Sequence, residues 1–459
     1  MKNKYLIKLR NGESLSIKDS MVMILTLSLP AILAQLSSVV MQYIDSAMVG
    51  RLGVHQSASI ALMSSTTWLF SGICTSIGIG FVVKIAHHIG AKEDREARNL
   101  VKIGLLFLLG VSLILLVVGV FLSRPLPVIL GGGREIVNDA TKYFFVYSLS
   151  MPAVIMVSGA GGMLQGAGIM KLPSLLNVLM CGLDVLFNAV LIFPSGTFPG
   201  IPTAGLGVLG AAMGTAFSQL VTSILMLLTL LVFSPLKLTS GEHFSFNMQE
   251  LTAALKISLP VLFESIVMSG AYIMSTRIVA PLGTLSIAAH SFAVTVESLC
   301  YMPGYGLESA ATTIIGQSLG AKRLDLTKRF GYMTVFLGMG IMGGMAILLY
   351  LFAPFMLALL TPSQGIIKLG TKVLRLEAFV EIFYGASIVA GGVFKGAGDT
   401  LIPSFMTLFS MWIVRLPAAY FLSHHFGLFG IWMAMASELV FRGVIFLVRL
   451  FKKSWLKNL

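Results

Sequence analysis

One stretch of sequence occurs twice in this chain. It reads GGMLQGAGIMKLPS at residues 161–174 and GGVFKGAGDTLIPS at residues 391–404, an offset of 230 residues. Further pairs stand in the same order at the same offset: Leu27-Ser28-Leu29-Pro30 with Ile257-Ser258-Leu259-Pro260, Leu52-Gly53 with Leu282-Gly283, and Gly90-Ala91-Lys92 with Gly320-Ala321-Lys322. Several ordered matches at one offset predict that the chain is an internal duplication.

The duplicated sequence is strongly apolar. Of its 459 residues, 56% are hydrophobic and only 11% are charged, against about 25% charged residues in an ordinary soluble domain. So few charges could not cover the surface of a soluble protein of this size. The composition therefore excludes a disordered chain, a disulfide scaffold and a water-soluble enzyme of ordinary design, and it predicts an integral membrane protein.

The apolar residues are gathered in runs long enough to span a bilayer. A transmembrane helix needs about 20 such residues, and twelve runs reach this length. They cover approximately residues 20–49, 56–83, 100–122, 140–163, 172–194, 207–233, 254–280, 286–315, 330–359, 374–397, 402–423 and 428–450. Strands of a membrane barrel would be shorter and would alternate. We therefore predict an all-α integral membrane protein with twelve transmembrane helices.

The offset of the repeat sets the expected symmetry. It contains six helices, so both halves enter the membrane in the same direction, and two six-helix bundles related by a pseudo-two-fold axis along the membrane normal are predicted. The predicted lobes are residues 1–235 and 236–459, joined by the polar stretch Lys237–Asn247. The offset has fallen to 220 at Gly207 and Gly427, so the first half carries about ten extra residues near Pro194–Gly205.

The formal net charge of +13 indicates how the protein is oriented in the membrane and does not indicate nucleic-acid binding. Basic clusters occupy the termini and alternate loops: Lys92, Arg95 and Arg98; Lys322, Arg323, Lys328 and Arg329; Arg449, Lys452, Lys453 and Lys457. The opposite loops hold only Arg51, Arg124, Arg134, Lys368 and Lys372. Because cytoplasmic loops carry the excess of Lys and Arg, we expect a multi-pass protein of the bacterial inner membrane with both termini in the cytoplasm.

A duplicated chain of this kind is typical of a transporter whose two bundles rock about a central site. A channel or a membrane-embedded enzyme also remains possible from architecture alone. However, the sequence has no metal-ligand cluster, His-rich helix or nucleophile motif, and Cys74, Cys181 and Cys300 lie inside apolar runs without metal or redox spacing. We therefore predict no enzymatic activity and no cofactor.

Several motifs resemble those of the multidrug and toxic compound extrusion (MATE) family, and together they cover nearly the whole chain. They are Leu29-Pro30, Tyr43-Ile44-Asp45, Met48-Val49-Gly50, the two Gly-Ala-Lys turns, residues 391–400 and Arg415-Leu416-Pro417. The resemblance implies an antiporter, functional as a monomer among membrane lipids, that exports lipophilic cations in exchange for Na⁺ or H⁺. The alternative is a lipid-linked saccharide flippase of the same superfamily, but the mainly acidic charges inside the membrane favour cationic cargo.

Ionisable residues within apolar runs are the candidate site residues, because each is costly in the bilayer core. Asp45 lies one turn after Gln42, which is predicted to contact substrate, while Asp184 and Asn188 form a polar stripe on another helix and Thr215 belongs to a third. Hard oxygen ligands of this kind suit Na⁺, and two close carboxylates can equally share a proton. The resemblance implies that Asp45, Asp184, Asn188 and Thr215 form the cation site of the first lobe. The structural alternative is a hydrogen-bonded network that locks the helices together.

The second lobe offers a different set of acids. Glu264 is predicted to be a further coupling residue, as in some branches of the family. One branch also carries an acid eleven residues before the basic residue of the exit motif, but that count from Lys395 reaches Tyr384, which is predicted to contact substrate. Glu381, one turn earlier, is expected to replace that acid, and Glu377, another turn earlier, is expected at the membrane interface.

Two further features suggest how the helices could respond to the ion. Pro30 removes a backbone hydrogen bond within its helix, so a hinge just before Asp45 is our hypothesis for coupling ion binding to helix shape. His290 and Glu297 are seven residues apart and therefore share a helix face. We expect a structural hydrogen bond there, with a proton relay as the alternative.

Overall fold

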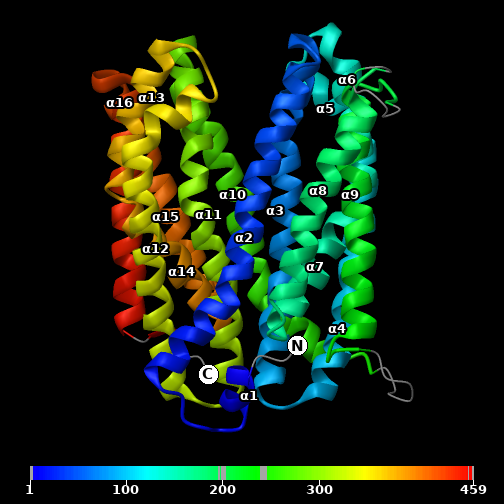
Figure 1. The fold of residues 1–459 in the computed structure, drawn as a ribbon, viewed down its shortest axis with the longest axis vertical. Helices are drawn as coiled ribbons and strands as arrows, with labels where there is room; N and C mark the ends of the chain where they lie inside the picture. The colour runs from blue at the N-terminus through cyan, green and yellow to red at the C-terminus, as the bar shows by residue number, and fades with distance from the viewer. Residues whose placement is uncertain (1–3, 195–196, 198–202, 238–244, 453, 457–459) are drawn as a thin grey trace. The chain divides into compact units, whose positions relative to one another are not determined.

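The computed structural model describes residues 4–194, 197, 203–237, 245–452 and 454–456, and every regular element in these ranges is a helix (Figure 1). The prediction of an all-α protein is therefore confirmed. Residues 238–244 of the predicted joint, most of the predicted insertion near Pro194–Gly205, and Lys453 and Lys457 of the last basic cluster lie outside the described residues.

Packing groups the chain into two units. Unit 1 comprises Met1–Leu36, Gly90–Lys92 and Phe263–Leu459, and unit 2 comprises Ser37–Ile89 and Glu93–Leu262. Two long helices, α2 (Ile17–Gly50) and α10 (Met248–Val279), contribute residues to both units. The predicted lobes 1–235 and 236–459 follow the duplication and not the packing, and they stay a prediction.

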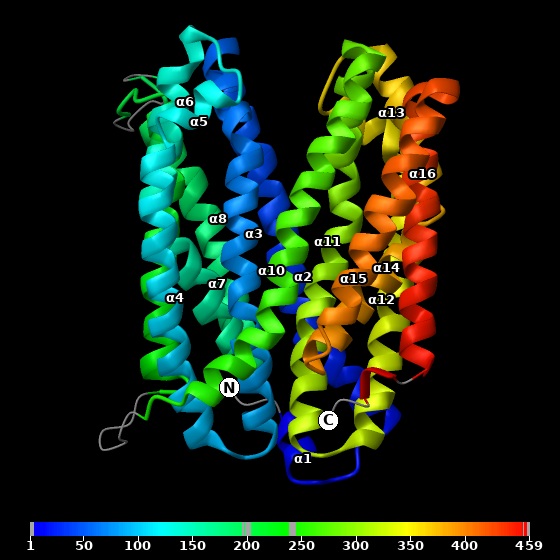
Figure 2. The ribbon, with the colours of Figure 1, turned by 180° about the vertical axis from the view of Figure 1, so that it is seen from behind.

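The remaining helices belong to one unit each, apart from Gly90, the last residue of α3, which is grouped with unit 1. In unit 2 they are α3 (Val54–Gly90), α4 (Asp94–Leu122), α5 (Pro125–Ile129), α6 (Arg134–Leu149), α7 (Met151–Gly166), α8 (Lys171–Ile192), α9 (Val208–Leu228) and the π-helix η1 (Thr229–Phe233). In unit 1 they are α1 (Lys4–Arg10), η2 (Ala280–Leu282), α11 (Thr284–Gly320), α12 (Leu324–Ala358), α13 (Gln364–Ala378), α14 (Glu381–Gly396), α15 (Leu401–Phe409), the π-helix η3 (Ser410–Arg415), α16 (Leu416–Lys452) and η4 (Ser454–Leu456). Figures 1 and 2 show the long helices of each unit running side by side along its length.

The backbone confirms the duplication. Helices α3 and α11 begin and end 230 residues apart, and so do α7 and α14. Each of the two Gly-Ala-Lys turns ends in a lysine with a left-handed backbone, Lys92 at φ 65° and Lys322 at φ 56°. This conformation costs a residue with a Cβ about 1–2 kcal/mol, so the same exception at the same place in both halves points to a common origin. Positive φ also recurs at the pairs Gly53 and Gly283, Gly168 and Gly398, and Gly207 and Gly427.

The apolar helices make the protein a multi-pass membrane protein. Nine helices within the described ranges are long and apolar enough to cross a bilayer, or ten if α6 and α7, which meet at 44°, count as one span. One of the nine is the 52-residue stretch Leu401–Lys452, which is interrupted at Gly427, where the backbone turns to φ 58° and ψ −138°. The predicted count of twelve spans is therefore not established by helix length and composition.

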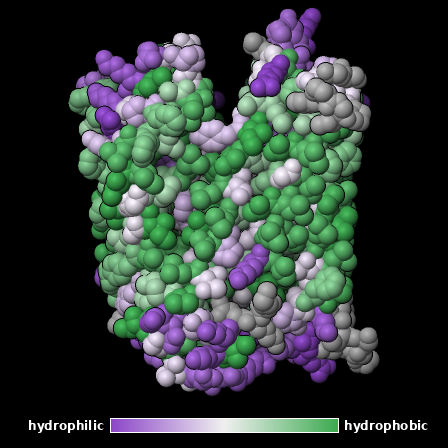
Figure 3. Space-filling model, in the orientation of Figure 1, coloured by the Kyte–Doolittle hydropathy of each residue, from purple (hydrophilic) through white to green (hydrophobic). Residues whose placement is uncertain are grey.

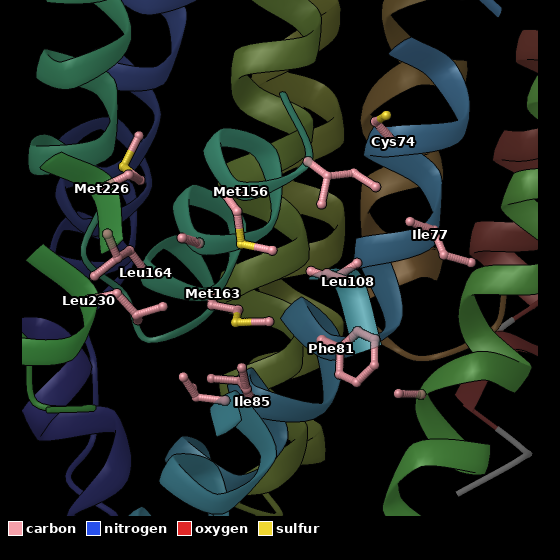
Figure 4. Packing of buried hydrophobic residues seen from close by; sticks show 14 of the residues in the cluster. Cys74, Ile77, Phe81, Ile85, Leu108, Met156, Met163, Leu164, Met226 and Leu230 are labelled. Atoms are coloured by element: carbon pink, nitrogen blue, oxygen red, sulfur yellow. The ribbon is translucent and has the colours of Figure 1, made fainter. Parts of the chain in front are cut away.

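Unit 2 is built around a core of sulfur-containing, aromatic and aliphatic side chains. Figure 4 shows Phe81 and Ile85 of α3, Leu108 of α4 and Met163 of α7 gathered in one layer. The helices approach closely at Gly104, where a Cβ would lie 2.6 Å from Met163 and 2.9 Å from Phe81. Small residues at such crossings let helix backbones approach each other in a membrane, where burial alone does not drive association.

The outer surface matches this environment. On the face shown in Figure 3, hydrophobic side chains cover the middle of each unit and hydrophilic ones gather at its ends. Helix α4 exposes Leu106, Leu113, Ile114, Val117 and Phe121 along one side. Large apolar side chains exposed in this number would be an aggregation surface in water, and they are the expected lipid contact of a spanning helix.

Helix α1 and the carboxyl-terminal end of α16 lie at the same end of unit 1 (Figure 2). Arg10 of α1 donates a hydrogen bond to Gln317 Oε1 at 3.0 Å. Arg329 of α12 donates to the carbonyl oxygen of Leu15 and to Ser20 Oγ, both at 2.9 Å. The amino-terminal segment is therefore fastened to the turn between α11 and α12, and α13 lies at the opposite end of the unit (Figure 1).

Candidate functional site

Three helices of unit 2 bring together a buried carboxyl pair. Asn188 of α8 donates from a single amide nitrogen to Asp45 Oδ1 of α2 at 3.0 Å and to Asp184 Oδ2 of α8 at 3.1 Å. Asp184 and Asn188 are only 1% and 2% exposed, and Asp45 is half-buried. Because one amide reaches both carboxyl groups, α2 and α8 are connected through the polar side chains of this cluster.

Helix α9 completes the cluster. Ser218 donates to Asp184 Oδ1 at 3.3 Å, and the Thr215 hydroxyl also hydrogen-bonds to Asp184. The close approach of α9 depends on Gly214, where a Cβ would lie 2.1 Å from Asn188 Oδ1. A larger residue at this position would force α9 away from α8 and would separate Thr215 and Ser218 from the aspartate.

Several polar atoms beside this cluster lack a hydrogen-bond partner. In the part of the chain that the structure describes, Asn188 Oδ1 is buried and accepts no hydrogen bond. The same holds for Asn177 Oδ1, Gln219 Oε1 and Thr222 Oγ1, which belong to the same two helices, α8 and α9. No Lys or Arg of the described residues forms an ion pair or hydrogen bond with Asp45 or Asp184. Unpaired buried acceptors next to two acids form an arrangement that a proton or a small cation would stabilise.

Glu264, the predicted coupling acid of the second half, lies in a different setting. Its carboxylate accepts a hydrogen bond from Ser404 of α15 at 2.6 Å. Lys395 of α14 forms an ion pair with Glu308 of α11 at 2.6 Å and is also attracted by Glu264. An ammonium group thus already neutralises part of the negative charge around Glu264.

A second group of acids is fully enclosed in unit 1. Glu377 at the end of α13 and Glu381 at the start of α14 are both 0% exposed, and Glu297 of α11 is 4% exposed. The Glu381 carboxyl contacts the thiol of Cys300. Glu377, which was expected at the membrane interface, is enclosed by protein because α13 packs it inward while the exposed face of α13 carries basic residues; its depth in the membrane stays a prediction.

Two arginines lie beside these acids. Glu438 of α16 is 0% exposed, and its carboxylate lies 3.0 Å from Arg442 Nε and 3.9 Å from Arg415 Nη1. Arg415 is the last residue of the π-helix η3, whose wider turn joins α15 directly to α16. The sequence places these charges near helix ends or breaks, and the structure shows that they form one buried ionic network.

A cavity of about 440 Å³ opens beside this network. Its wall includes Glu297, Arg415 and Arg442, together with the rings of Tyr301 and Tyr384, whose centroids are 5.5 Å apart. The Arg442 guanidinium lies 5.4 Å from the Tyr384 ring centroid. Aromatic rings and a few charged groups are typical of a small-molecule site, so the cavity can hold a flat organic compound.

Comparison with known families identifies the fold. A sequence profile described as MatE matches residues 30–190 and 260–421, one stretch in each half of the duplicated chain. The chain belongs to the MatE family. The predicted resemblance is therefore confirmed, and the two matched stretches begin 230 residues apart, as the repeat requires.

Relatives of this MatE protein cover almost its whole length. It is 25% identical over 443 residues to a probable multidrug resistance protein NorM of Thermotoga maritima, across 95% of this chain and 93% of that protein. It is 26% identical over 454 residues to a protein of the same description from Oceanobacillus iheyensis, across 95% and 98% of the two chains. A crystal structure of MATE in complex with MaL6 has a TM-score of 0.91 at 22% identity over 100% of both chains, which shows that the fold is shared.

The structure of the MatE chain brings together four of the predicted site residues and separates two others. Asp45, Asp184, Asn188 and Thr215 meet in one cluster, as the sequence predicts. Glu264 and Glu381 belong to separate groups, one around Lys395 and one around Glu297 and Glu377. Gln42 is exposed on α2, and Tyr384 lines the cavity of unit 1; their contacts with substrate stay a prediction.

Some residues of the MatE sites were not predicted from sequence. Ser218 follows Thr215 by three positions and therefore lies on the same face of α9, a spacing that could have identified it. His290 was expected to bond with Glu297, but its Nδ1 accepts a hydrogen bond from the Trp432 indole at 3.2 Å. No spacing within α11 could reveal a partner that belongs to α16.

Proposed function

We propose that this protein is a multidrug efflux antiporter that exports lipophilic, mainly cationic compounds in exchange for H⁺ or Na⁺. Family membership and the probable multidrug resistance relatives support the transport class. The observation that carries the coupling site is the pair Asp45 and Asp184, held by one Asn188 amide. The same proposal places the chain in the bacterial inner membrane with both termini in the cytoplasm.

The proposed coupling follows from electrostatics within unit 2. Two carboxylates bridged by one amide repel each other when both are ionised, and the repulsion is strong where water is scarce. A proton or Na⁺ between them removes this repulsion and holds α2 against α8. When the ion leaves, the state in which α2 moves away from α8 becomes more favourable. The ion thus changes the balance of two states through its different affinity for each.

Substrate export requires that the two lobes open alternately to either side. In the proposed cycle, the ion enters from outside, binds at Asp45 and favours the state from which the substrate leaves. The tyrosine-lined cavity of unit 1 is the proposed site for an aromatic substrate, with Glu297 available for a cationic group. A saccharide flippase would need basic groups for its lipid phosphate, but Arg415 and Arg442 are already paired with Glu438.

The test is ethidium transport in everted membrane vesicles, with the pH gradient and the Na⁺ gradient varied separately. The parent protein should accumulate ethidium in response to one of the gradients. Asp45→Asn should abolish this response, because a neutral amide neither releases a proton nor attracts Na⁺ as strongly as a carboxylate does.

The matched control is Asp139→Asn. Asp139 is an acid of α6 in the same unit, and it lies outside the cluster. The Asp139→Asn variant should therefore leave transport unchanged. If no gradient drives ethidium transport by the parent, the proposed antiport is wrong. If Asp45→Asn transports like the parent while the gradient still matters, coupling does not use the Asp45 cluster.

A further inference from the structure

An open basic groove lies along α13, the helix at the end of unit 1 opposite to α1 (Figure 1). Its volume is about 740 Å³, and its wall combines cationic and aromatic side chains from α12, α13 and α16. The cationic side chains of the wall are Lys368, Lys372 and Arg375, and its aromatic side chains are Tyr350, Phe379 and Phe429. We call this site the α13 groove.

The three cations of the α13 groove point to one side of their helix. Lys368, Lys372 and Arg375 occupy positions i, i+4 and i+7 and therefore share one face, and all three are exposed. Lys372 Nζ lies 4.3 Å from the Phe429 ring centroid, and Arg375 lies 5.1 Å from that of Tyr350 while donating to its carbonyl oxygen. The aromatic contacts hold the charges in place without neutralising them.

No carboxylate balances this charge nearby. Two neighbouring segments border the α13 helix. Phe429 packs on Lys372, and a Cβ at Gly365 would lie 3.3 Å from Leu285. None of the residues that line the α13 groove is an Asp or Glu, and Glu377, two positions after Arg375, is 0% exposed on the buried side of α13. Loops on this side of the chain are otherwise poor in Lys and Arg, so three cations on one helix stand out as an anion-attracting surface.

The groove continues into an apolar surface. Phe379 is 70% exposed at its edge, and Phe355 and Leu359 of the adjoining α12 end are 63% and 72% exposed. Cations beside exposed aromatic rings occur where a protein crosses from hydrocarbon to headgroup. A ligand that satisfies both surfaces carries an anionic group and a long apolar part.

We propose that the α13 groove binds an anionic phospholipid, with the phosphate at Lys368, Lys372 and Arg375 and an acyl chain along the exposed end of α12. The arginine fork and the two ammonium groups are suited to phosphate oxygens. The acyl chain covers apolar rings that would otherwise face headgroups and water. This site does not depend on the proposed antiport, because none of its residues belongs to the two acidic clusters.

The experiment is native mass spectrometry of the full-length protein in detergent, titrated with phosphatidylglycerol or phosphatidylcholine. The parent should retain phosphatidylglycerol in clear preference. The variant Lys368→Gln/Lys372→Gln/Arg375→Gln should bind it about 100-fold more weakly, since each cation near a lipid headgroup contributes about fivefold. Thermal unfolding without lipid checks that the variant is folded.

The matched control is Arg51→Gln/Arg124→Gln/Arg134→Gln. It removes the same charge from three exposed arginines of unit 2 that are predicted on the same side of the membrane. It should bind phosphatidylglycerol like the parent. Equal weakening in both variants would overturn the proposal in favour of unspecific charge attraction, and no weakening in the α13 variant would overturn it outright.

A second arm separates lipid from free phosphate. Inorganic phosphate, at concentrations that saturate a simple anion site, should leave the retained phosphatidylglycerol in place and should not raise the unfolding temperature. If inorganic phosphate displaces the lipid and stabilises the protein equally well, the α13 groove is a site for soluble anions and the lipid proposal is wrong.

Discussion

The best-connected acids of the two units differ in the charge of their partners. In unit 2, Asp45 and Asp184 have amide and hydroxyl neighbours and no cationic partner among the described residues. In unit 1, Glu438 is paired with Arg415 and Arg442, and Glu264 lies near Lys395. A charge that is already paired gains little from an incoming ion, which supports the proposal that the coupling ion binds at Asp45 and Asp184. Glu377 and Glu381 of unit 1 are the exception among the described residues, because their buried oxygens have no hydrogen-bond partner.

One pair of equivalent positions shows how the duplicated halves diverged. Glu297 and Glu377, which repel each other in unit 1, correspond at the offset of 230 to Thr67 and Tyr147 of unit 2. There, the Tyr147 hydroxyl donates to the Thr67 carbonyl oxygen at 2.8 Å. The same meeting point of two helices therefore holds a satisfied hydrogen bond in one half and two carboxyl groups in the other.

The largest effect should come from removing either acid of the Asp45 and Asp184 pair. Asp45→Asn alone should reduce gradient-driven ethidium transport by about 100-fold, comparable with the loss of a group on which a coupled step depends. Asp45→Asn/Asp184→Asn should be no worse than either single variant, because the two acids bind one ion together. Additive losses in the vesicle assay would show that the two carboxyl groups act separately.

The ionic network of unit 1 should matter for stability. Glu438→Ala leaves Arg415 and Arg442 without their buried partner, which should destabilise the protein by about 3 kcal/mol, measured as a lower unfolding temperature in detergent. Asp325→Ala removes the exposed partner of Arg323 and should cost at most about 1 kcal/mol. Similar losses for both variants would contradict a structural role for the buried network.

A moderate effect is expected at Pro30 in α2. Pro30→Ala restores a backbone hydrogen bond and should stiffen the helix that carries Asp45. The dependence of ethidium transport on pH or Na⁺ should then become weaker, by a few-fold. Pro260→Ala in α10 is the matched variant, because Pro260 occupies the equivalent position in the second half of the duplicated chain. If Pro30→Ala keeps the transport rate and the ion response of the parent, the hinge hypothesis fails.

The smallest effect is expected at Glu381. Its carboxylate oxygens have no hydrogen-bond partner apart from the weak contact with the Cys300 thiol, so Glu381→Gln should change stability by no more than about 1 kcal/mol. Transport should keep its ion dependence if unit 2 alone binds the coupling ion. A loss as large as that of Asp45→Asn would instead give unit 1 its own coupling site and would remove the contrast between the halves.

The sequence by itself determined the helical class, the duplication and the family. Long apolar runs leave only helices that satisfy their own backbone in a membrane, and the 230-residue offset appears unchanged in the bounds of α3 and α11. Spacing along each helix showed which polar residues share a face with Asp45, Asp184 or Thr215, and the resemblance to the MATE family implied that these residues and Asn188 lie together.

Only the tertiary structure decided which faces meet. Spacing along a helix defines a face but not the neighbour that covers it, so Glu264 and Glu381 could not be assigned to separate clusters from sequence. For the same reason the burial of Glu377 was missed: α13 is amphipathic, and the packing of its apolar side inward set the position of the acid. The partners of a buried charge come from other helices, and only the folded chain brings them together.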